Sequence, residues 1–98
     1  MSAARHVRIR GLVQAVGFRA WTQSVALHRG IEGWVRNRRD GSVEAVFAGE
    51  PDAVATMIAA CRQGPPGSDV AAVDEREASQ EELNYRRAGE RFSIIATV

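Results

Sequence analysis

Hydrophobic and polar residues alternate along several short stretches of the chain, as they do in strands that bury one face. The stretches that predict strands cover residues 7–13, 31–38, 42–48, 70–78 and 92–98. Arg39-Asp40-Gly41 separates the second stretch from the third and has the composition of a hairpin turn. The strands on either side of this turn are therefore expected to pair directly.

Other stretches place their apolar residues at the spacing of a helix. Residues 18–29 form the first of these, and Gly30 follows as a stop signal. A second helix opens at Gly49-Glu50-Pro51. Its apolar residues recur at i, i+3, i+4 and i+7, at Val54, Met57, Ile58 and Cys61. Residues 79–82 have the form of a capping box and predict one short helical turn.

The elements follow in the order strand, helix, strand, strand, helix, strand, with one extra strand at the C-terminus. This ferredoxin-like βαββαβ pattern predicts an α+β sandwich with two helices on one face of an antiparallel sheet. No linker divides the chain, so residues 1–98 are expected to form one domain. Because the first helix runs back along the sheet, the first two strands should run in the same direction. The loop 14–19 and Asn37, which follow or end these strands, should then meet at one sheet edge.

Composition places the chain among ordinary soluble proteins, with 45% hydrophobic and 26% charged residues. No apolar run approaches the roughly 18 residues of a membrane span, and the N-terminus lacks the apolar core of a signal peptide. We therefore expect a cytoplasmic protein without a membrane partner, and a monomer. Cys61 is the single cysteine and is expected in the core. With no cluster of Cys and His, we predict no metal site and no cofactor.

The net charge of +1 conceals an asymmetry between the two halves of the chain. Residues 1–49 hold eight arginines and three acidic residues, whereas residues 50–98 hold five arginines and nine acidic residues. All thirteen basic residues are arginine, a bias that the coding composition of the source genome also explains. The basic half contains a glycine loop, and a positive potential focused there would favour an anionic ligand.

That loop lies in Gly11-Leu12-Val13-Gln14-Ala15-Val16-Gly17-Phe18-Arg19, between the first strand and the first helix. The first N–H groups of a helix have no intrahelical partner and lie at the positive end of its dipole. Glycine allows close approach of a ligand, and the guanidinium of Arg19 matches two oxygens of a phosphate. A cation is unfavourable at a helix start, which indicates that an anion is bound beside it. We interpret the loop residues Gln14, Ala15, Val16, Gly17 and Phe18 as a phosphate cradle.

Two segments resemble the signature stretches of the acylphosphatases. The first runs from Gly11 to Arg19, and the second is Gly33-Trp34-Val35-Arg36-Asn37, followed by Gly41, Val43 and Gly49. They stand in the usual order and separation, and the resemblance covers nearly the whole chain. It implies metal-independent hydrolysis of the carboxyl-phosphate bond of an acyl phosphate, which gives a carboxylate and inorganic phosphate. It also implies that Arg19 binds the phosphate, that Asn37 positions the attacking water, and that residues 14–18 supply backbone N–H groups.

These residue types suit that reaction. An acyl phosphate has a good leaving group, so positioning and charge stabilisation can carry the phosphoryl transfer. Asn37 cannot act as a general base near neutral pH, but its amide can hold a water molecule. In one respect the sequence departs from the family, which usually has glycine where this chain has Ala15. If this position needs a positive φ, alanine would cost about 1–2 kcal/mol.

A second class of function stays open from the sequence. Ferredoxin-like domains also bind nucleic acid, regulatory ligands or partner proteins, and the fold alone does not choose between these functions. A catalytically weakened module that binds anions, RNA or a partner is the alternative, and Ala15 is the feature that would support lost activity. RNA binding is disfavoured, because the strand 42–48 offers one aromatic residue, Phe47, for base stacking. Nothing in the sequence specifies the acyl group.

Overall fold

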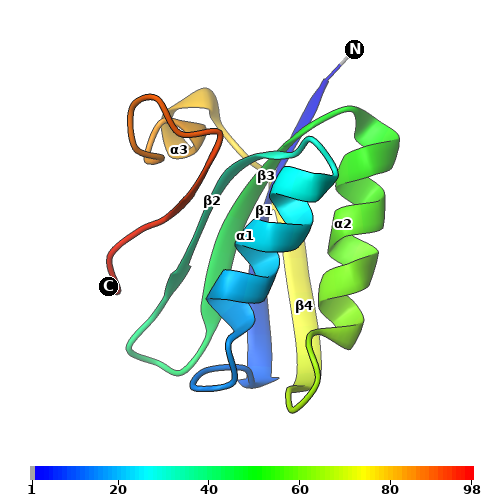
Figure 1. The fold of residues 1–98 in the computed structure, drawn as a ribbon, viewed down its shortest axis with the longest axis vertical. Helices are drawn as coiled ribbons and strands as arrows, with labels where there is room; N and C mark the ends of the chain where they lie inside the picture. The colour runs from blue at the N-terminus through cyan, green and yellow to red at the C-terminus, as the bar shows by residue number, and fades with distance from the viewer. Residues whose placement is uncertain (1) are drawn as a thin grey trace.

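Two helices, α1 (Phe18–His28) and α2 (Pro51–Gln63), lie side by side on one face of a five-stranded sheet (Figure 1). The structure is a computed structural model and describes residues 2–98. The remaining elements are β1 (Ala3–Leu12), β2 (Glu32–Asn37), β3 (Val43–Gly49), β4 (Asp69–Glu77), α3 (Gln80–Leu83) and β5 (Phe92–Ile94). The predicted α+β sandwich of ferredoxin-like type is confirmed.

The strand order β4-β1-β3-β2-β5 places β3 between β1 and β2. Both of these strands pair antiparallel with β3, so they run in the same direction, as predicted. The expectation of a wholly antiparallel sheet is wrong at one edge, because β5 pairs parallel with β2. The segment that contains α3 carries the chain from β4 across to the opposite edge, where it enters β5 in the direction of β2.

Two strand boundaries differ from the predicted ones by more than one residue. β1 begins at Ala3 rather than at residue 7, because its first residues pair with the end of β3. β5 ends at Ile94 rather than at residue 98. Beyond Ile94 the chain still follows β2, since the N–H of Val98 donates to the carbonyl oxygen of Asn37 at 3.3 Å. Isolated hydrogen bonds of this kind replace the regular ladder at the C-terminal end.

The core lies between the two long helices and the sheet. Its largest buried side chains on this side include Phe18, Phe47, Phe92, Ile9 and Met57. The apolar stripe of α2 is buried as its spacing predicts. Burial raises the pKa of the Cys61 thiol to about 12, so this thiol stays protonated at neutral pH and is a core residue.

The opposite face of the sheet, called the open face below, carries no long helix, and its tryptophan is covered. Trp34 is 1% exposed, and its Nε1 donates a hydrogen bond to the carbonyl oxygen of Glu82 in α3 at 2.7 Å. The ring of Tyr85 lies 5.8 Å from that of Trp34, and the guanidinium of Arg36 lies 4.8 Å from the Trp34 ring centroid. Trp34 is therefore not free to stack on a nucleic-acid base.

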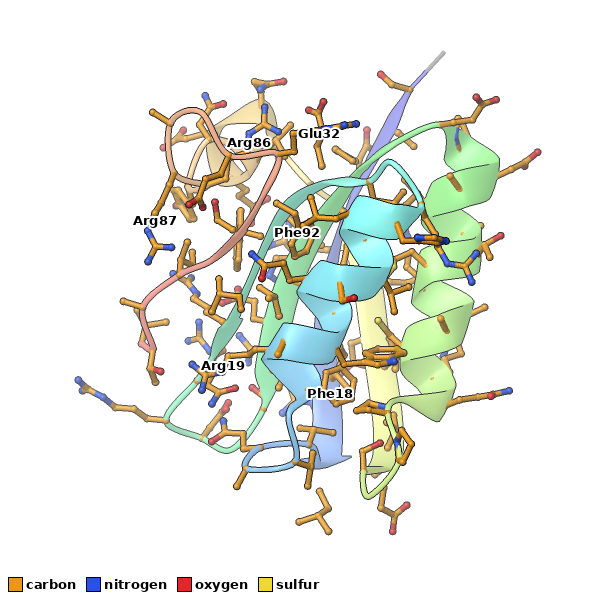
Figure 2. The ribbon with its side chains drawn as sticks, in the orientation of Figure 1. Phe18, Arg19, Glu32, Arg86, Arg87 and Phe92 are labelled. Carbon is orange, nitrogen blue, oxygen red and sulfur yellow. The ribbon has the colours of Figure 1, made fainter. Side chains whose placement is uncertain are left out.

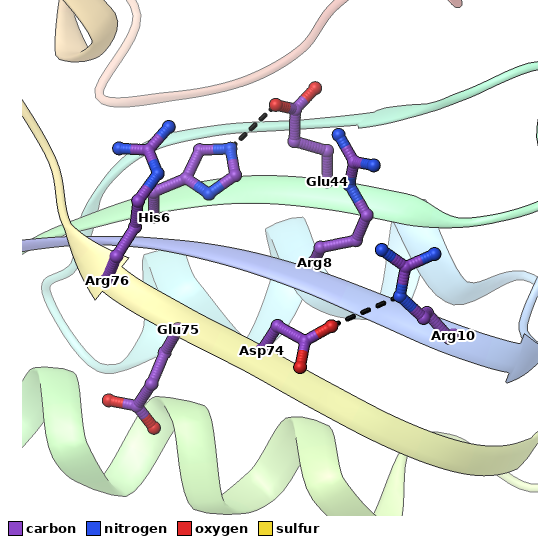
Figure 3. Close-up of a pocket in the computed structure, with 7 residues that line it drawn as sticks. All are labelled: His6, Arg8, Arg10, Glu44, Asp74, Glu75 and Arg76. Atoms are coloured by element: carbon purple, nitrogen blue, oxygen red, sulfur yellow. Dashed lines mark hydrogen bonds and ion pairs between the residues drawn. The ribbon is translucent and has the colours of Figure 1, made fainter.

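A buried carboxylate, Glu44, holds several charged side chains of the open face (Figure 3 shows its bond to His6). His6 Nε2 lies 2.6 Å from Glu44 Oε2, while Arg36 Nε and Arg38 Nη1 donate to Oε1 at 2.7 and 3.0 Å. Burial disfavours the charged carboxylate. The hydrogen bonds from His6, Arg36 and Arg38 outweigh burial and lower the pKa of Glu44 far below its usual range. The side chains of Arg36 and Arg38 are thus held by Glu44 on the open face.

Replacing Glu44 tests this network. Glu44→Gln should lower the free energy of unfolding at neutral pH by roughly 2–3 kcal/mol, because two arginines lose their carboxylate. The pKa of Glu44 is lowered in the folded protein, so its stabilisation is complete above the ordinary value of 4.5 and declines as the pH falls below it. Urea unfolding should show the variant and the wild type converging between about pH 4.5 and pH 3. A constant difference over that range would contradict this assignment.

Gly33 marks the closest approach of β2 to β3. It has φ +141°, and a Cβ atom there would lie 1.8 Å from the carbonyl oxygen of Val46. Gly41, in the turn between these strands, has φ +94°, but a Cβ atom there would meet nothing within 4 Å. Gly33→Ala should therefore destabilise the protein by more than about 3 kcal/mol and Gly41→Ala by about 1–2 kcal/mol. Equal urea midpoints for the two variants would show that the protein does not depend on the close contact between β2 and β3 at Gly33.

Candidate active site

The loop between β1 and α1 depends on backbone conformations that few residues adopt. Ala15 has φ +61° and Gly17 has φ +78°, whereas Val16 between them is not left-handed. Gly11 lies at a register shift in the pairing of β1 with β4, and a Cβ atom there would lie 2.3 Å from the carbonyl oxygen of Asp69. The glycines let β1 pack tightly against β4 and then let the chain turn into α1.

The backbone N–H groups of this loop are not used within the part of the chain that the structure describes. The six successive N–H groups from Ala15 to Ala20 donate no hydrogen bond to any group of residues 2–98. Within the same residues, α1 has no side-chain cap at Gly17 and no acidic residue in its first turn. The start of α1 is therefore suited to bind a negatively charged group.

Arg19 lies in the first turn of α1, on the side that faces β2 (Figure 2). Nine of the thirteen arginines form ion pairs with acidic side chains. Arg19 is half-buried but forms neither an ion pair nor a side-chain hydrogen bond with residues 2–98. A cation in this position, at the positive end of a helix, favours a bound anion.

Asn37 is the last residue of β2 and presents a second uncommitted polar group. Its carbonyl oxygen accepts a hydrogen bond from Val98, which helps to fix its backbone. Its half-buried side-chain amide makes no hydrogen bond with any described residue. The amide can therefore donate to, and accept from, a ligand or a water molecule.

A cavity of about 280 Å³ brings these groups together. It is lined by Val13, Gln14, Ala15, Gly17, Phe18, Arg19, Ala20, Asn37 and Ile94. The convergence of the loop and Asn37 that the topology predicts is thus found in the structure. One cation, one amide, a row of N–H groups and apolar walls together suit a small anion that carries an apolar part.

The predicted cradle residues contribute in different ways. Phe18 is 2% exposed and belongs to the core, so only its backbone can serve the cavity, and the side chain of Val16 packs against the core. The side-chain amide of Gln14 donates to two backbone carbonyl groups, those of Arg38 and Ser42 at the β2–β3 turn. Ile94 lines the cavity but was not predicted to do so. No sequence signal places it there, because its position depends on the parallel pairing of β5 with β2.

A second cavity, of about 350 Å³, lies on the open face and differs in its charges (Figure 3). It is lined by His6, Arg8, Arg10, Glu44, Asp74, Glu75 and Arg76. Each arginine there has an acidic partner: Arg10 bonds Asp74 at 3.1 Å, Arg8 lies 3.6 Å from Asp40, and Arg76 bonds Glu82 at 2.6 Å. In contrast to the cavity at α1, its cations are already paired.

The chain also matches known proteins closely. A model of the acylphosphatase family matches residues 5–94. An acylphosphatase of Bradyrhizobium diazoefficiens is 59% identical over 96 residues, which cover 98% of this chain and 97% of that protein. The chain belongs to the acylphosphatase family. Members of this family are hydrolases that act on acyl phosphates.

Solved acylphosphatase structures have the same fold. The crystal structure of an acylphosphatase from Bacillus subtilis matches with a TM-score of 0.82 and 34% identity, covering 97% of this chain and 99% of that chain. An acylphosphatase from Coxiella burnetii matches with a TM-score of 0.83 and 29% identity, covering 96% of this chain and 93% of that chain. The resemblance of the signature segments is therefore accompanied by agreement of the fold over nearly the whole length.

Ala15 is the residue at which the sequence departs from the family resemblance, and the structure shows the conformation that it adopts. Its φ of +61° is left-handed, so the cradle keeps a glycine conformation with an alanine in it. Ala15 is exposed, which leaves room for its methyl group at the edge of the cavity. The alanine thus places its strain in the loop, in a backbone conformation that favours glycine.

Glycine substitutions at Ala15 and at Ala20 test whether the backbone of Ala15 is strained. Ala15→Gly should stabilise the protein by about 0.5–1 kcal/mol, because relief of the left-handed strain exceeds the added freedom of the unfolded chain. Ala20→Gly, in the first turn of α1, should destabilise it by about 0.5–1 kcal/mol. Thermal unfolding measures both changes. Destabilisation by both substitutions would show that Ala15 is not strained.

Proposed function

We propose that this acylphosphatase transfers the phosphoryl group of an acyl phosphate to water without a metal ion. The proposal rests on one observation: Arg19, Asn37 and five of the six residues from Ala15 to Ala20 line one cavity, and neither these two side chains nor the six N–H groups have a hydrogen-bond partner in residues 2–98. No group of three or more His, Cys, Asp or Glu side chains that could hold a metal ion occurs in residues 2–98. The charge of the phosphate is instead met by the backbone and by Arg19.

Arg19 and the cradle bind the phosphoryl group in this mechanism. The N–H groups of residues 15–20 donate to phosphate oxygens, and the guanidinium of Arg19 adds a fixed positive charge beside them. Phosphoryl transfer spreads negative charge over the equatorial oxygens, so donors that are already in place stabilise the transition state. The apolar wall, which includes Ile94, is left for the acyl side of the substrate.

Asn37 positions the attacking water. Its amide oxygen can accept a hydrogen bond from the water, while its NH₂ group can donate to the water or to a phosphate oxygen. The water oxygen forms a bond to phosphorus as the bond from phosphorus to the carboxyl oxygen breaks, and the carboxylate leaves. The proton of the water passes to a phosphate oxygen, because an amide does not accept it at neutral pH. The products are a carboxylate and inorganic phosphate.

Several further properties remain predictions. None of the helices in residues 2–98 has the length and apolar character that crossing a membrane requires. We propose that the protein is cytoplasmic and monomeric, that residues 1–98 form a single domain, and that it has no nucleic-acid partner. A module that binds anions without turnover is the alternative outcome of the experiment below.

Hydrolysis of benzoyl phosphate in the presence of EDTA tests the proposal. The purified protein should release benzoate and phosphate rapidly, with a rate that added Mg²⁺ or Zn²⁺ does not increase. A folded protein that releases no product would contradict the enzymatic proposal and favour the alternative, a module that binds anions without turnover. Release that stops in EDTA and returns with a metal ion would instead contradict the metal-independent mechanism.

Two variants divide the roles of the site. Arg19→Ala should lower kcat/KM by at least about a thousand-fold and abolish competitive inhibition by phosphate, since the fixed cation is lost. Asn37→Ala should lower kcat by about a hundred-fold or more but leave the inhibition constant of phosphate nearly unchanged. Arg29→Ala removes an exposed arginine at the other end of α1 and is the control, with kinetics close to wild type. Equal loss of phosphate inhibition in the Arg19 and Asn37 variants would contradict this division.

A further inference from the structure

The side chain of Gln14 joins the two halves of the candidate site. Its Nε2 donates hydrogen bonds to the carbonyl oxygens of Arg38, at 2.7 Å, and of Ser42, at 2.9 Å. Both N–H bonds of one amide are therefore used within the protein. Gln14 precedes the left-handed residue Ala15 in the cradle, and Arg38 directly follows Asn37. One side chain thus connects the first residue of the cradle to the residue after Asn37.

The turn that accepts these hydrogen bonds is itself well ordered by hydrogen bonds. The N–H of Arg38 donates to the carbonyl oxygen of Ser42 at 2.9 Å, and the N–H of Gly41 donates to the carbonyl oxygen of Arg38 at 3.1 Å. The backbone N–H and hydroxyl of Ser42 both donate to Asp40 Oδ1, at 2.9 and 2.6 Å. The amide of Gln14 therefore ties the loop to a turn whose own backbone is held by hydrogen bonds.

No other side-chain hydrogen bond within residues 2–98 links the loop 13–19 to β2, β3 or the turn between them. Arg19 and the cradle N–H groups belong to one continuous segment, whereas Asn37 belongs to another strand. Their separation is set by the backbone ladders that pair β1 and β2 with β3, by packing, and by the two hydrogen bonds of Gln14. A change at Gln14 should therefore move the two segments relative to each other without altering either one internally.

We propose that Gln14 is a positioning residue that fixes the distance between the bound phosphoryl group and the water held by Asn37. This inference rests on the function proposed above. In-line attack needs the water oxygen close to phosphorus and aligned with the leaving group, and a misplacement of about 1 Å can cost a hundred-fold in rate. Phosphate binding needs only the cradle and Arg19. Loss of the Gln14 contact should consequently lower kcat and leave phosphate binding intact.

Gln14→Glu gives this role a pH signature. The carboxylate has a length similar to that of glutamine, but it has no hydrogen to donate and faces two carbonyl oxygens. A protonated carboxyl group can donate one hydrogen bond and restore part of the contact. Against benzoyl phosphate, kcat should be about a hundred-fold low at about pH 7.5 and should recover several-fold as the pH falls toward about 5. The inhibition constant of inorganic phosphate should stay within about threefold of wild type throughout.

Gln23→Glu is a matched control. Gln23 Nε2 also donates to a backbone carbonyl oxygen, that of Phe92 at 3.0 Å, but it joins α1 to β5 and does not line the site. This variant should keep the kcat of wild type over the same pH range. Gln14→Met removes both donors at similar length, so its kcat should be low at every pH and show no acid recovery. Circular dichroism confirms that each variant is folded before its kinetics are compared.

The outcomes separate this inference from the proposed function. If wild type hydrolyses benzoyl phosphate and Gln14→Glu retains its full kcat at about pH 7.5, Gln14 has no positioning role. The role is also refuted if Gln14→Met loses phosphate inhibition as strongly as kcat, since that pattern indicates collapse of the cradle. A wild type without activity overturns the proposed function itself. Acid recovery of kcat in Gln14→Glu alone, with unchanged phosphate inhibition, supports the inference.

Discussion

The structure is organised around the uncapped start of α1. Six N–H groups in succession lack a partner among residues 2–98, and no acidic side chain in the first turn of the helix offsets its dipole. Leaving these groups uncapped costs stability unless an anion or water binds them. The left-handed backbone at Ala15 and Gly17 and the buried ring of Phe18 keep the segment in this form. The uncapped N–H groups and the left-handed backbone lower the stability of the protein without a ligand, and they also create the site.

Sheet topology supplies the second half of the site. Because β1 and β2 both run antiparallel to β3, their C-terminal ends lie at the same end of the strands. There Arg19 and Asn37 line one cavity. Charges elsewhere are arranged differently. Arg36 and Arg38 are the two residues on either side of Asn37 in the sequence, yet their side chains bond Glu44 on the open face. Positive charge near the site is thus concentrated in Arg19 and in the helix dipole.

Much of this could be predicted from the sequence, because local rules agreed with one another. Alternation and helical spacing located the elements, and the strand–helix–strand order brought the loop to Asn37. Three features escaped prediction. Ile94 lines the cavity through a parallel pairing that no local pattern specifies. The bonds of Gln14 depend on a turn distant in sequence. The φ of Ala15 could be read only from the folded loop, since alanine itself disfavours that conformation.

The central claim is that the site holds phosphorus, not the acyl carbon, for attack by water. Hydrolysis of benzoyl phosphate in water enriched in ¹⁸O, followed by mass analysis of both products, tests this claim most directly. Attack on phosphorus in the Arg19 cradle breaks the phosphorus–oxygen bond, and one ¹⁸O atom should enter inorganic phosphate while benzoate stays unlabelled. Label in benzoate and none in phosphate would mean that water attacks the carbonyl carbon, and it would contradict the roles assigned to Arg19 and Asn37.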